Sequence, residues 1–234
     1  MANYKNVTHC LFDMDGLLID TEYRYTEAYN KVLNKYGKNF SWELKASIMG
    51  FHFNEAAKRV VEFLELPITP EELMDQVTPY YDILFPDSQL MPGAERLLRH
   101  LVKHNIPIAL ATSSSEKSYE LKTRKLKPFF ELFHHRVLGG SDPDVKHGKP
   151  APDIFLVAAS RFSDSNPVQP LLFQCLVFED APNGVEAAVG AGMQVVMVPD
   201  SNLPKELTKK ATMVLNSLEE FKPELFGLPP FPQE

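Results

Sequence analysis

Residues 7–16 have the sequence VTHCLFDMDG, an apolar run that ends in two aspartates and a glycine. Its β-branched and aromatic residues favour a strand over Val7 to Asp13, and Gly16 lets the backbone leave that strand sharply. Such a strand carries two carboxylates, Asp13 and Asp15, at its carboxyl end. Taken alone, an Asp-x-Asp-Gly segment is equally typical of an ordinary turn.

Five more short apolar runs follow, separated by longer amphipathic stretches. They are Ile106 to Ala111, His135 to Leu138, Phe173 to Glu179, Gln194 to Val198 and Met213 to Leu215. Alternation of short strands with helices is typical of βαβ units. The pattern therefore predicts an α/β fold with a doubly wound, mostly parallel sheet, a Rossmann-like core.

The alternation is interrupted between the first two strands. Thr21 to Tyr36 and Asn54 to Glu65 have the apolar spacing of helices, and Thr69 to Glu72 has the capping residue, proline and early acids of a helix start. We therefore expect an inserted all-helical cap domain over residues 20–87. The catalytic core domain would comprise residues 1–19 and 88–234.

The composition excludes several classes of protein. Hydrophobic residues make up 44% and the net charge is -7, which disfavours a nucleic acid polymer as partner because phosphate-neutralising proteins cluster Lys and Arg. No apolar run approaches the roughly 18 residues needed to span a bilayer, and the first residues show no targeting pattern. We expect a cytoplasmic protein without a membrane partner. Cys10 and Cys175 lie in apolar runs and are expected to be reduced core thiols.

Acidic residues follow two of the predicted strands. Ligands of open parallel sheets bind beyond the carboxyl ends of the strands, where Asp13 and Asp15 can approach Glu179 and Asp180. Four converging carboxylates would repel one another without a cation. Oxygen ligands suit Mg²⁺, whereas the sequence has no Cys/His cluster of the kind that binds zinc.

Phosphate-binding groups accompany these acids. Thr112 and Ser113 follow the second strand, where hydroxyls and backbone N–H groups can bind an anion at a helix start. Each hydroxyl could instead simply cap the helix. The ammonium of Lys149, within His147 to Pro150, could hold a phosphoryl oxygen.

These segments, in this order, resemble the four motifs of the haloacid dehalogenase-like hydrolases, and the resemblance covers essentially the whole chain. It implies a Mg²⁺-dependent phosphomonoesterase that acts on a small phosphorylated metabolite. In that family the first aspartate attacks phosphorus, which implies that Asp13 forms an aspartyl-phosphate and that Asp15 serves as general acid and then base. The implied metal ligands are Asp13, Asp15 through its backbone carbonyl, Asp180, and Glu179 either directly or through a water molecule. The implied phosphate-binding residues are Thr112, Ser113 and Lys149.

Other branches of the family differ at marked positions. Metal-independent dehalogenases need no second aspartate, so Asp15 with Asp180 indicates phosphate chemistry. The similar β-phosphoglucomutases have an Arg after the cap glycine and a His early in the first cap helix, where this sequence has Phe53 and Tyr25. The similar phosphonatases need a cap lysine, yet none lies between Lys45 and Lys58.

The resemblance is strongest to a branch that acts on pseudouridine 5'-phosphate. It depends on Leu90 to Glu95, Leu110 to Ser114, Val177 to Ala188, Gly192 to Asp200 and the ending from Leu215 to Pro229. In this interpretation Gly50, Phe51, His52 and Phe53 bind the leaving group. The alternatives are a phosphatase of a sugar, glycerol or flavin phosphate, a phosphosugar mutase, and a catalytically inactive binding protein.

Overall fold

The computed structural model describes residues 4–48, 53–164 and 170–232. Six strands within these ranges form one sheet. Its order is β3-β2-β1-β4-β5-β6, and every pairing between these strands is parallel. The strands are β1 (His9–Phe12), β2 (Ile108–Thr112), β3 (His135–Leu138), β4 (Cys175–Glu179), β5 (Gln194–Met197) and β6 (Met213–Val214). The predicted parallel sheet is confirmed, and each strand lies within its predicted run or within one residue of it.

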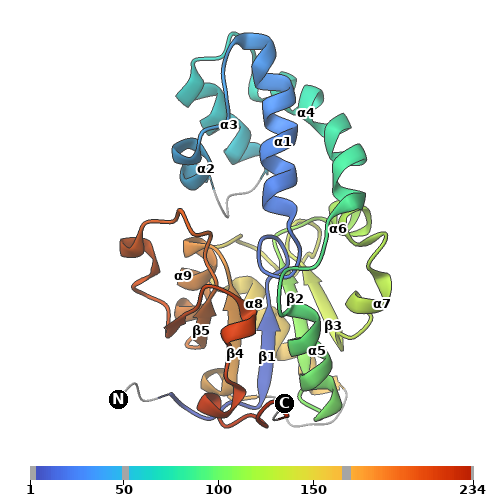
Figure 1. The fold of residues 1–234 in the computed structure, drawn as a ribbon, viewed down its shortest axis with the longest axis vertical. Helices are drawn as coiled ribbons and strands as arrows, with labels where there is room; N and C mark the ends of the chain where they lie inside the picture. The colour runs from blue at the N-terminus through green and yellow to red at the C-terminus, as the bar shows by residue number, and fades with distance from the viewer. Residues whose placement is uncertain (1–3, 49–52, 165–169, 233–234) are drawn as a thin grey trace.

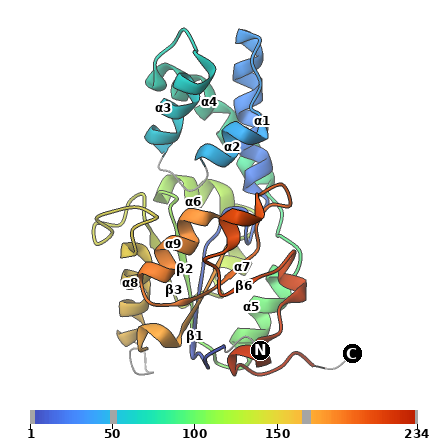
Figure 2. The ribbon, with the colours of Figure 1, turned by 90° about the vertical axis from the view of Figure 1, so that its left-hand side faces the viewer.

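Helices cover both faces of the sheet (Figures 1 and 2). One face packs on α5 (Ala94–Lys103), α7 (Lys127–Phe130) and the 3-10 turns η6 (Leu218–Glu220) and η7 (Pro223–Phe226). The other packs on α8 (Asp153–Ser160) and α9 (Pro182–Gly190). Side chains alternate between the two: Cys10 and Phe12 enter the first hydrophobic cluster and Leu11 enters the second. Burial on both faces explains why β1 is apolar throughout its length.

A separate group of helices stands beyond the carboxyl ends of the strands, at the top of Figure 1. These are α1 (Thr21–Leu33), α2 (Trp42–Ile48), α3 (Phe53–Leu64) and α4 (Pro70–Leu84), which share a third hydrophobic cluster. The predicted start of α4 is confirmed, because the Thr69 hydroxyl accepts from Glu72 N–H at 3.2 Å and the Glu72 carboxylate accepts from Thr69 N–H at 2.8 Å. The first helix is shorter than predicted: it ends at Leu33, and a 3-10 turn continues to Tyr36.

The two connections between these helices and the sheet lie side by side. Ile19 forms a bridge with Leu90, and Met91 N–H donates to the Leu18 carbonyl at 2.8 Å. Beside them, Asp20 N–H donates to the Gln89 carbonyl at 3.0 Å, and Gln89 N–H donates back to the Asp20 carboxylate at 2.7 Å. The chain therefore leaves the sheet and returns to it along one hydrogen-bonded pair of segments.

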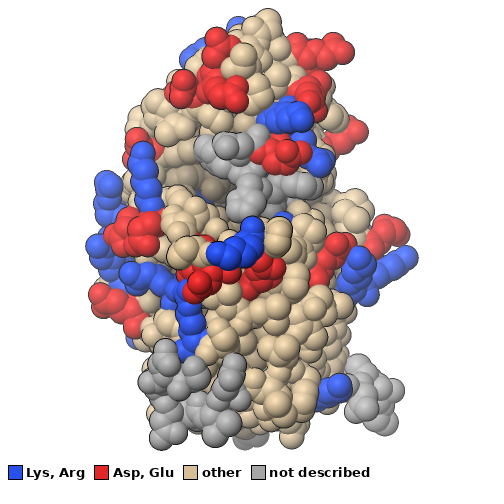
Figure 3. Space-filling model, turned by 180° about the vertical axis from the view of Figure 1, so that it is seen from behind, with Lys and Arg blue, Asp and Glu red and all other residues tan. Residues whose placement is uncertain are grey.

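Cys10 and Cys175 are free and buried on the neighbouring strands β1 and β4, as expected of core thiols. Burial raises the pKa of both, that of Cys175 to about 12, so both remain protonated at neutral pH. Among the described residues, every helix is too short or too polar to cross a lipid bilayer. On the face shown in Figure 3, acidic and basic side chains are interspersed.

Buried His9 in β1 gives the fold a measurable pH dependence. Its imidazole is 3% exposed, and burial, with the nearby His134, lowers its pKa from 6.5 to about 4. As the pH falls, His9 takes up a proton in the unfolded chain before it does so in the folded protein. The folded state is therefore undiminished in stability above pH 6.5 and loses stability as the pH falls from 6.5 toward 4. We expect this group to contribute about 2 to 3 kcal/mol of the fall in unfolding free energy over that range.

Urea unfolding of the wild type and of His9→Phe between pH 7.5 and 4 isolates this contribution from that of the carboxylates. The unfolding free energy of the wild type minus that of His9→Phe should become smaller or more negative as the pH falls, because only the wild type loses this contribution. A constant difference across the range would contradict the assignment.

Candidate active site

A cavity of about 490 Å³ lies between the carboxyl edge of the sheet and the helices above it. This is the side of an open parallel sheet on which ligands bind. The acidic residues predicted from the strand ends meet there, together with Lys149. The lining from the sheet side includes Asp13, Asp15, Ser113, Ser114, Ser115, Lys149, Glu179 and Asp180.

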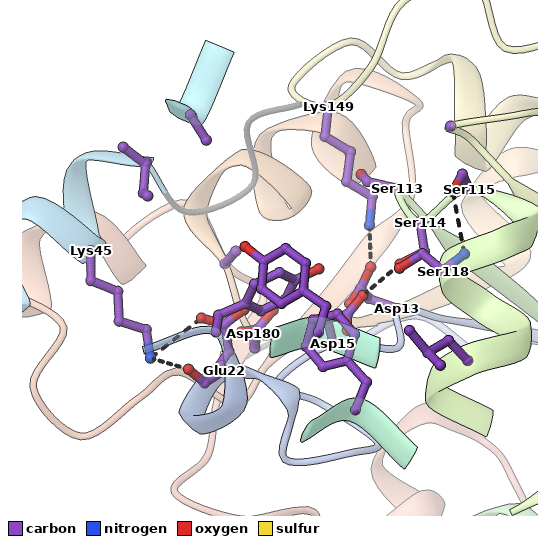
Figure 4. A pocket seen from close by; sticks show the side chains of 18 of the residues that line it. Asp13, Asp15, Glu22, Lys45, Ser113, Ser114, Ser115, Ser118, Lys149 and Asp180 are labelled. Carbon is purple, nitrogen blue, oxygen red and sulfur yellow. Dashed lines mark hydrogen bonds and ion pairs between the residues drawn. The ribbon is translucent and has the colours of Figure 1, made fainter. Parts of the chain in front are cut away.

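Asp13 and Glu179 share one ammonium group, that of Lys149. Lys149 Nζ lies 2.6 Å from Asp13 Oδ1 and 2.6 Å from Glu179 Oε1, and it also donates to the Ala111 carbonyl at 3.2 Å. Figure 4 shows Lys149 directed at Asp13 from the loop before α8. Burial raises the pKa of Asp13 to about 7, although the charge of Lys149 opposes the rise. Asp13, Glu179 and Asp180 together therefore present more carboxyl groups than the Lys149 ammonium can neutralise.

The acidic residues suit a divalent cation with oxygen ligands. Carboxylate oxygens of Asp13, Glu179 and Asp180 lie within 4.8 Å of one another, and all three residues are buried. Burial, with the neighbouring charges of Glu179 and Asp13, raises the pKa of Asp180 well above its usual value. A cation would relieve this repulsion, and hard oxygen donors with few protein ligands fit Mg²⁺.

Two glycines make room for these carboxylates. Gly16 has a φ of +78°, and a Cβ at this position would overlap the Asp180 carboxylate. A Cβ on Gly184 would overlap the carboxylate of Glu179. Glu179 Oε2 in turn accepts from the N–H groups of Asp180 and Ala181, at 3.0 and 3.2 Å. Gly16 thus serves both the turn and the close approach of a carboxylate, and Gly184, within α9, serves the close approach.

The Asp15 carboxylate is held apart from this acidic group. Oδ1 accepts from the Thr21 hydroxyl at 2.5 Å and from Lys122 Nζ at 2.6 Å, and Oδ2 accepts from the Ser114 hydroxyl at 3.0 Å. Burial opposes ionisation, but the charge and hydrogen bonds of Lys122, with those of Thr21 and Ser114, lower the pKa of Asp15 below its usual value. The two aspartates therefore have opposite environments although they are two residues apart.

The hydroxyl groups after β2 have different partners. Thr112 is fully buried, and its hydroxyl accepts from Ser114 N–H at 3.2 Å. Ser113 and Ser114 line the cavity. Ser115 caps α6 (Glu116–Thr123) by accepting from Ser118 N–H at 3.3 Å, the alternative role foreseen for a hydroxyl in this segment. Binding of phosphate by Thr112, Ser113 and Lys149 stays a prediction.

The helical side of the cavity presents polar and aromatic groups. Lys45 Nζ lies 3.3 Å from Glu22 Oε2 at its edge, as Figure 4 shows. Tyr25, Tyr29, Tyr81 and Phe85 form an aromatic wall. Of the predicted leaving-group residues, Gly50, Phe51 and His52 lie outside the described residues, and Phe53 begins α3.

Sequence reasoning missed several residues of this site, among them Glu22, Lys45, Ser114 and Lys122. Glu22 directly follows Thr21 at the start of α1, where an acid is also favoured by the helix dipole. Lys45 lies on α2, and Lys122 lies on α6 together with Lys117. For a lysine on a helix an exposed position is the ordinary expectation. For Ser114 alone the sequence offered an indication of a role in the site, because it directly follows Thr112 and Ser113, the predicted phosphate-binding residues.

Comparison with known proteins agrees with this geometry. Residues 7–192 match the model of the haloacid dehalogenase-like hydrolase family. A probable pseudouridine-5'-phosphatase of Drosophila melanogaster is 54% identical, covering 99% of this chain and 99% of its own. The mitochondrial (DL)-glycerol-3-phosphatase 1 of Arabidopsis thaliana is 50% identical over 98% of this chain and 76% of its own.

Solved structures support the fold. A haloacid dehalogenase family hydrolase from Deinococcus radiodurans superposes with a TM-score of 0.75 at 24% identity, covering 98% of this chain and all of the other. The predictions of the family and of a phosphatase are confirmed by the family match and by relatives named as phosphatases. The chain belongs to the haloacid dehalogenase-like hydrolase family.

Proposed function

We propose that the protein is a Mg²⁺-dependent phosphomonoesterase that works through an aspartyl-phosphate on Asp13. The observation that carries the proposal is the separation of two aspartates in one cavity. Asp13 lies among the acidic residues beside Lys149, and Asp15 is held independently by Thr21, Ser114 and Lys122. Two carboxyl groups in different environments can act as nucleophile and as proton carrier.

The residues perform two transfers. Asp13 attacks phosphorus, and the bond from phosphorus to the leaving oxygen breaks. Asp15, which must first take up a proton because Lys122 lowers its pKa, gives that proton to the leaving oxygen. Water then attacks phosphorus and gives a proton to Asp15, while the bond between phosphorus and Asp13 breaks and inorganic phosphate is released. Lys149 stabilises the negative charge of the transferring group.

A metal ion would be held by Asp13, Glu179 and Asp180 with the Asp15 backbone carbonyl. When bound, Mg²⁺ supplies positive charge that neutralises phosphoryl oxygens and orients the substrate. Without it, the buried carboxylates of Asp13, Glu179 and Asp180 face the phosphate with one ammonium, that of Lys149, between them. These three carboxyl groups by themselves would therefore repel a phosphate.

We also propose a division of the chain into two domains. Residues 1–19 and 88–234 form the catalytic core domain, and residues 20–87 form the cap that closes the cavity and excludes water. Support comes from the separate hydrophobic cluster of α1 to α4 and from the paired connections at Ile19 and Leu90. We place the enzyme in the cytoplasm, acting on a small phosphate ester.

For the substrate we propose pseudouridine 5'-phosphate. The most informative support is the 54% identical relative named as a probable pseudouridine-5'-phosphatase. The cavity adds an aromatic wall that could stack on a base, and the Lys45–Glu22 pair offers a donor beside an acceptor for the polar edge of the ring. Glycerol 3-phosphate is the second candidate because of the 50% identical plant relative.

We expect kcat/KM for pseudouridine 5'-phosphate to exceed that for uridine 5'-phosphate by about 5- to 150-fold. The two nucleotides differ by an exposed ring N–H, and one hydrogen bond to a buried partner is worth about 1 to 3 kcal/mol. Measurement under identical Mg²⁺ should include glycerol, deoxyglucose and flavin phosphates, with a phosphosugar isomerisation assay for mutase activity. A competitor with an equal or higher kcat/KM would reject this substrate and leave the phosphatase proposal intact.

A further inference from the structure

Lys122 on α6 is a buried lysine with a full set of partners. Its Nζ donates to Asp15 Oδ1 at 2.6 Å, to the Tyr25 hydroxyl at 2.8 Å and to Ser114 Oγ at 2.9 Å. An ammonium has three donors, so each has an acceptor. The side chain is 0% exposed, and the ring centroids of Tyr25 and Phe85 lie 4.9 and 5.0 Å from Nζ.

Packing alone does not explain a charge at this position. Removing an ammonium from water is strongly unfavourable unless it is paired and hydrogen-bonded. An apolar side chain of similar length would fill the space beside the rings of Tyr25 and Phe85 without that cost. The distinguishing property of Lys122 is therefore its charge, and the carboxylate that this charge meets is that of Asp15.

The contacts place Lys122 behind the reacting groups. Asp15, Tyr25 and Ser114 all line the cavity, and the ammonium reaches it through them. Ser114 also donates to Asp15 Oδ2 at 3.0 Å, so Lys122 fixes one carboxylate oxygen directly and the other through Ser114. Two contact points define the rotation of the carboxyl group as well as its position.

The third partner of Lys122 comes from a different part of the molecule. Tyr25 stands on α1, whereas Lys122 and Ser114 belong to α6 and to the loop after β2. Burial raises the pKa of Tyr25 to about 12, so its hydroxyl remains protonated and serves as a neutral acceptor. The hold on Asp15 is therefore complete only when α1 lies against α6.

We propose that Lys122 is a positioning residue for the general acid: it orients the Asp15 carboxyl group toward the leaving oxygen when the helical cap is in place. The inference rests on the proposed function, in which Asp15 gives its proton to that oxygen as the bond to phosphorus breaks. Lys122 neither gains nor loses a proton in this step. Its effect should therefore depend on how much the leaving group needs protonation.

The test compares leaving groups in Lys122→Met, which removes the charge and keeps the length of the side chain. kcat/KM reports the step in which the phosphoryl group is transferred to Asp13. A nitrophenolate can leave in this step without being protonated, whereas an alkoxide needs a proton from a general acid. For the alkyl esters glycerol 3-phosphate and pseudouridine 5'-phosphate we expect a loss of about 10- to 100-fold, part of the 10²- to 10⁴-fold typical of general acids. For 4-nitrophenyl phosphate we expect a loss of less than about threefold.

Two controls make the outcome decisive. Lys127→Met, at an exposed lysine paired with Glu120, should keep both values. In an Asp15→Asn background, Lys122→Met should cause no further loss with alkyl esters, because no acid is left to position. Equal losses with both kinds of ester, or no loss with either, would overturn the proposal.

Two further results separate the remaining explanations. If Lys122→Met does not fold, Tyr25→Phe keeps the charge and removes one acceptor, and the same comparison decides: a loss confined to alkyl esters supports the proposal, and any other pattern overturns it. An Asp15→Asn enzyme that loses activity equally with both esters would instead reject the acid role of Asp15. That result overturns the proposed function and the role of Lys122 together, whereas failure of Lys122→Met alone leaves the proposed function standing.

Discussion

Asp13→Asn should lower kcat by at least about 10⁴-fold while the protein keeps its fold. The amide has nearly the same shape as the carboxylate, but it is a poor nucleophile and cannot form the aspartyl-phosphate. A loss of this size corresponds to about 5.5 kcal/mol of barrier. Steady-state kinetics with an alkyl phosphate and thermal unfolding of the same preparation measure the two expectations.

The matched control is Asp75→Asn, the same chemical change at an exposed position on α4. It should leave kcat within about twofold of the wild type, since it removes no group from the cavity. Asp13→Asn activity within about tenfold of the wild type, only about 1.4 kcal/mol of barrier, would show that another group attacks phosphorus.

Removal of Mg²⁺ should abolish turnover, and Mg²⁺ should restore it in full. Ca²⁺ should inhibit, because its longer bonds and larger coordination number would misalign the attacking carboxylate. The acidic group of Asp13, Glu179 and Asp180 motivates this expectation. Activity in excess chelator, titrated back with each cation, is the direct measurement.

Thermal unfolding gives a second measurement that does not depend on turnover. Mg²⁺ should raise the Tm of the wild type in proportion to the logarithm of its concentration above Kd. Asp180→Asn should raise the metal-free Tm, because it relieves repulsion among buried carboxylates, and should weaken the response to Mg²⁺. Full activity in chelator, or an unchanged Mg²⁺ response in Asp180→Asn, would exclude this metal site.

Local patterns were sufficient to predict the sheet and the acidic half of the site. β1 is apolar because both faces of the sheet are covered, and its aspartates stand at the edge where parallel strands end. Alternating strands and helices then bring Glu179 and Asp180 to the same edge. The approach of Asp13 to the Glu179–Asp180 pair follows from the pairing of β1 with β4, which the order of the strands along the chain does not itself predict.

The half of the site that depends on side-chain direction was beyond the reach of the same reasoning. Lys122 meets Asp15 across 107 positions of sequence and Tyr25 across 97, so no local pattern marks which lysine of α6 turns inward. Thr112 and Ser113 show that the direction of neighbouring side chains is equally hard to predict. The Thr112 hydroxyl accepts from Ser114 N–H, whereas Ser113 lines the cavity. Rotamer choice depends on neighbours that only the folded chain brings together.

The paired segments at Ile19 and Leu90 have a consequence for how such an enzyme can diversify. The two segments are hydrogen-bonded to each other, so the helices between them form a loop whose two ends are joined where they meet the sheet. The entropy of closing a loop rises only slowly with its length, by about 0.6 kcal/mol for each doubling. Residues between these segments can therefore be lengthened, shortened or exchanged at little thermodynamic cost to the sheet. New leaving groups can be accommodated in this way as long as Thr21 and Tyr25, which hold Asp15 directly and through Lys122, are kept.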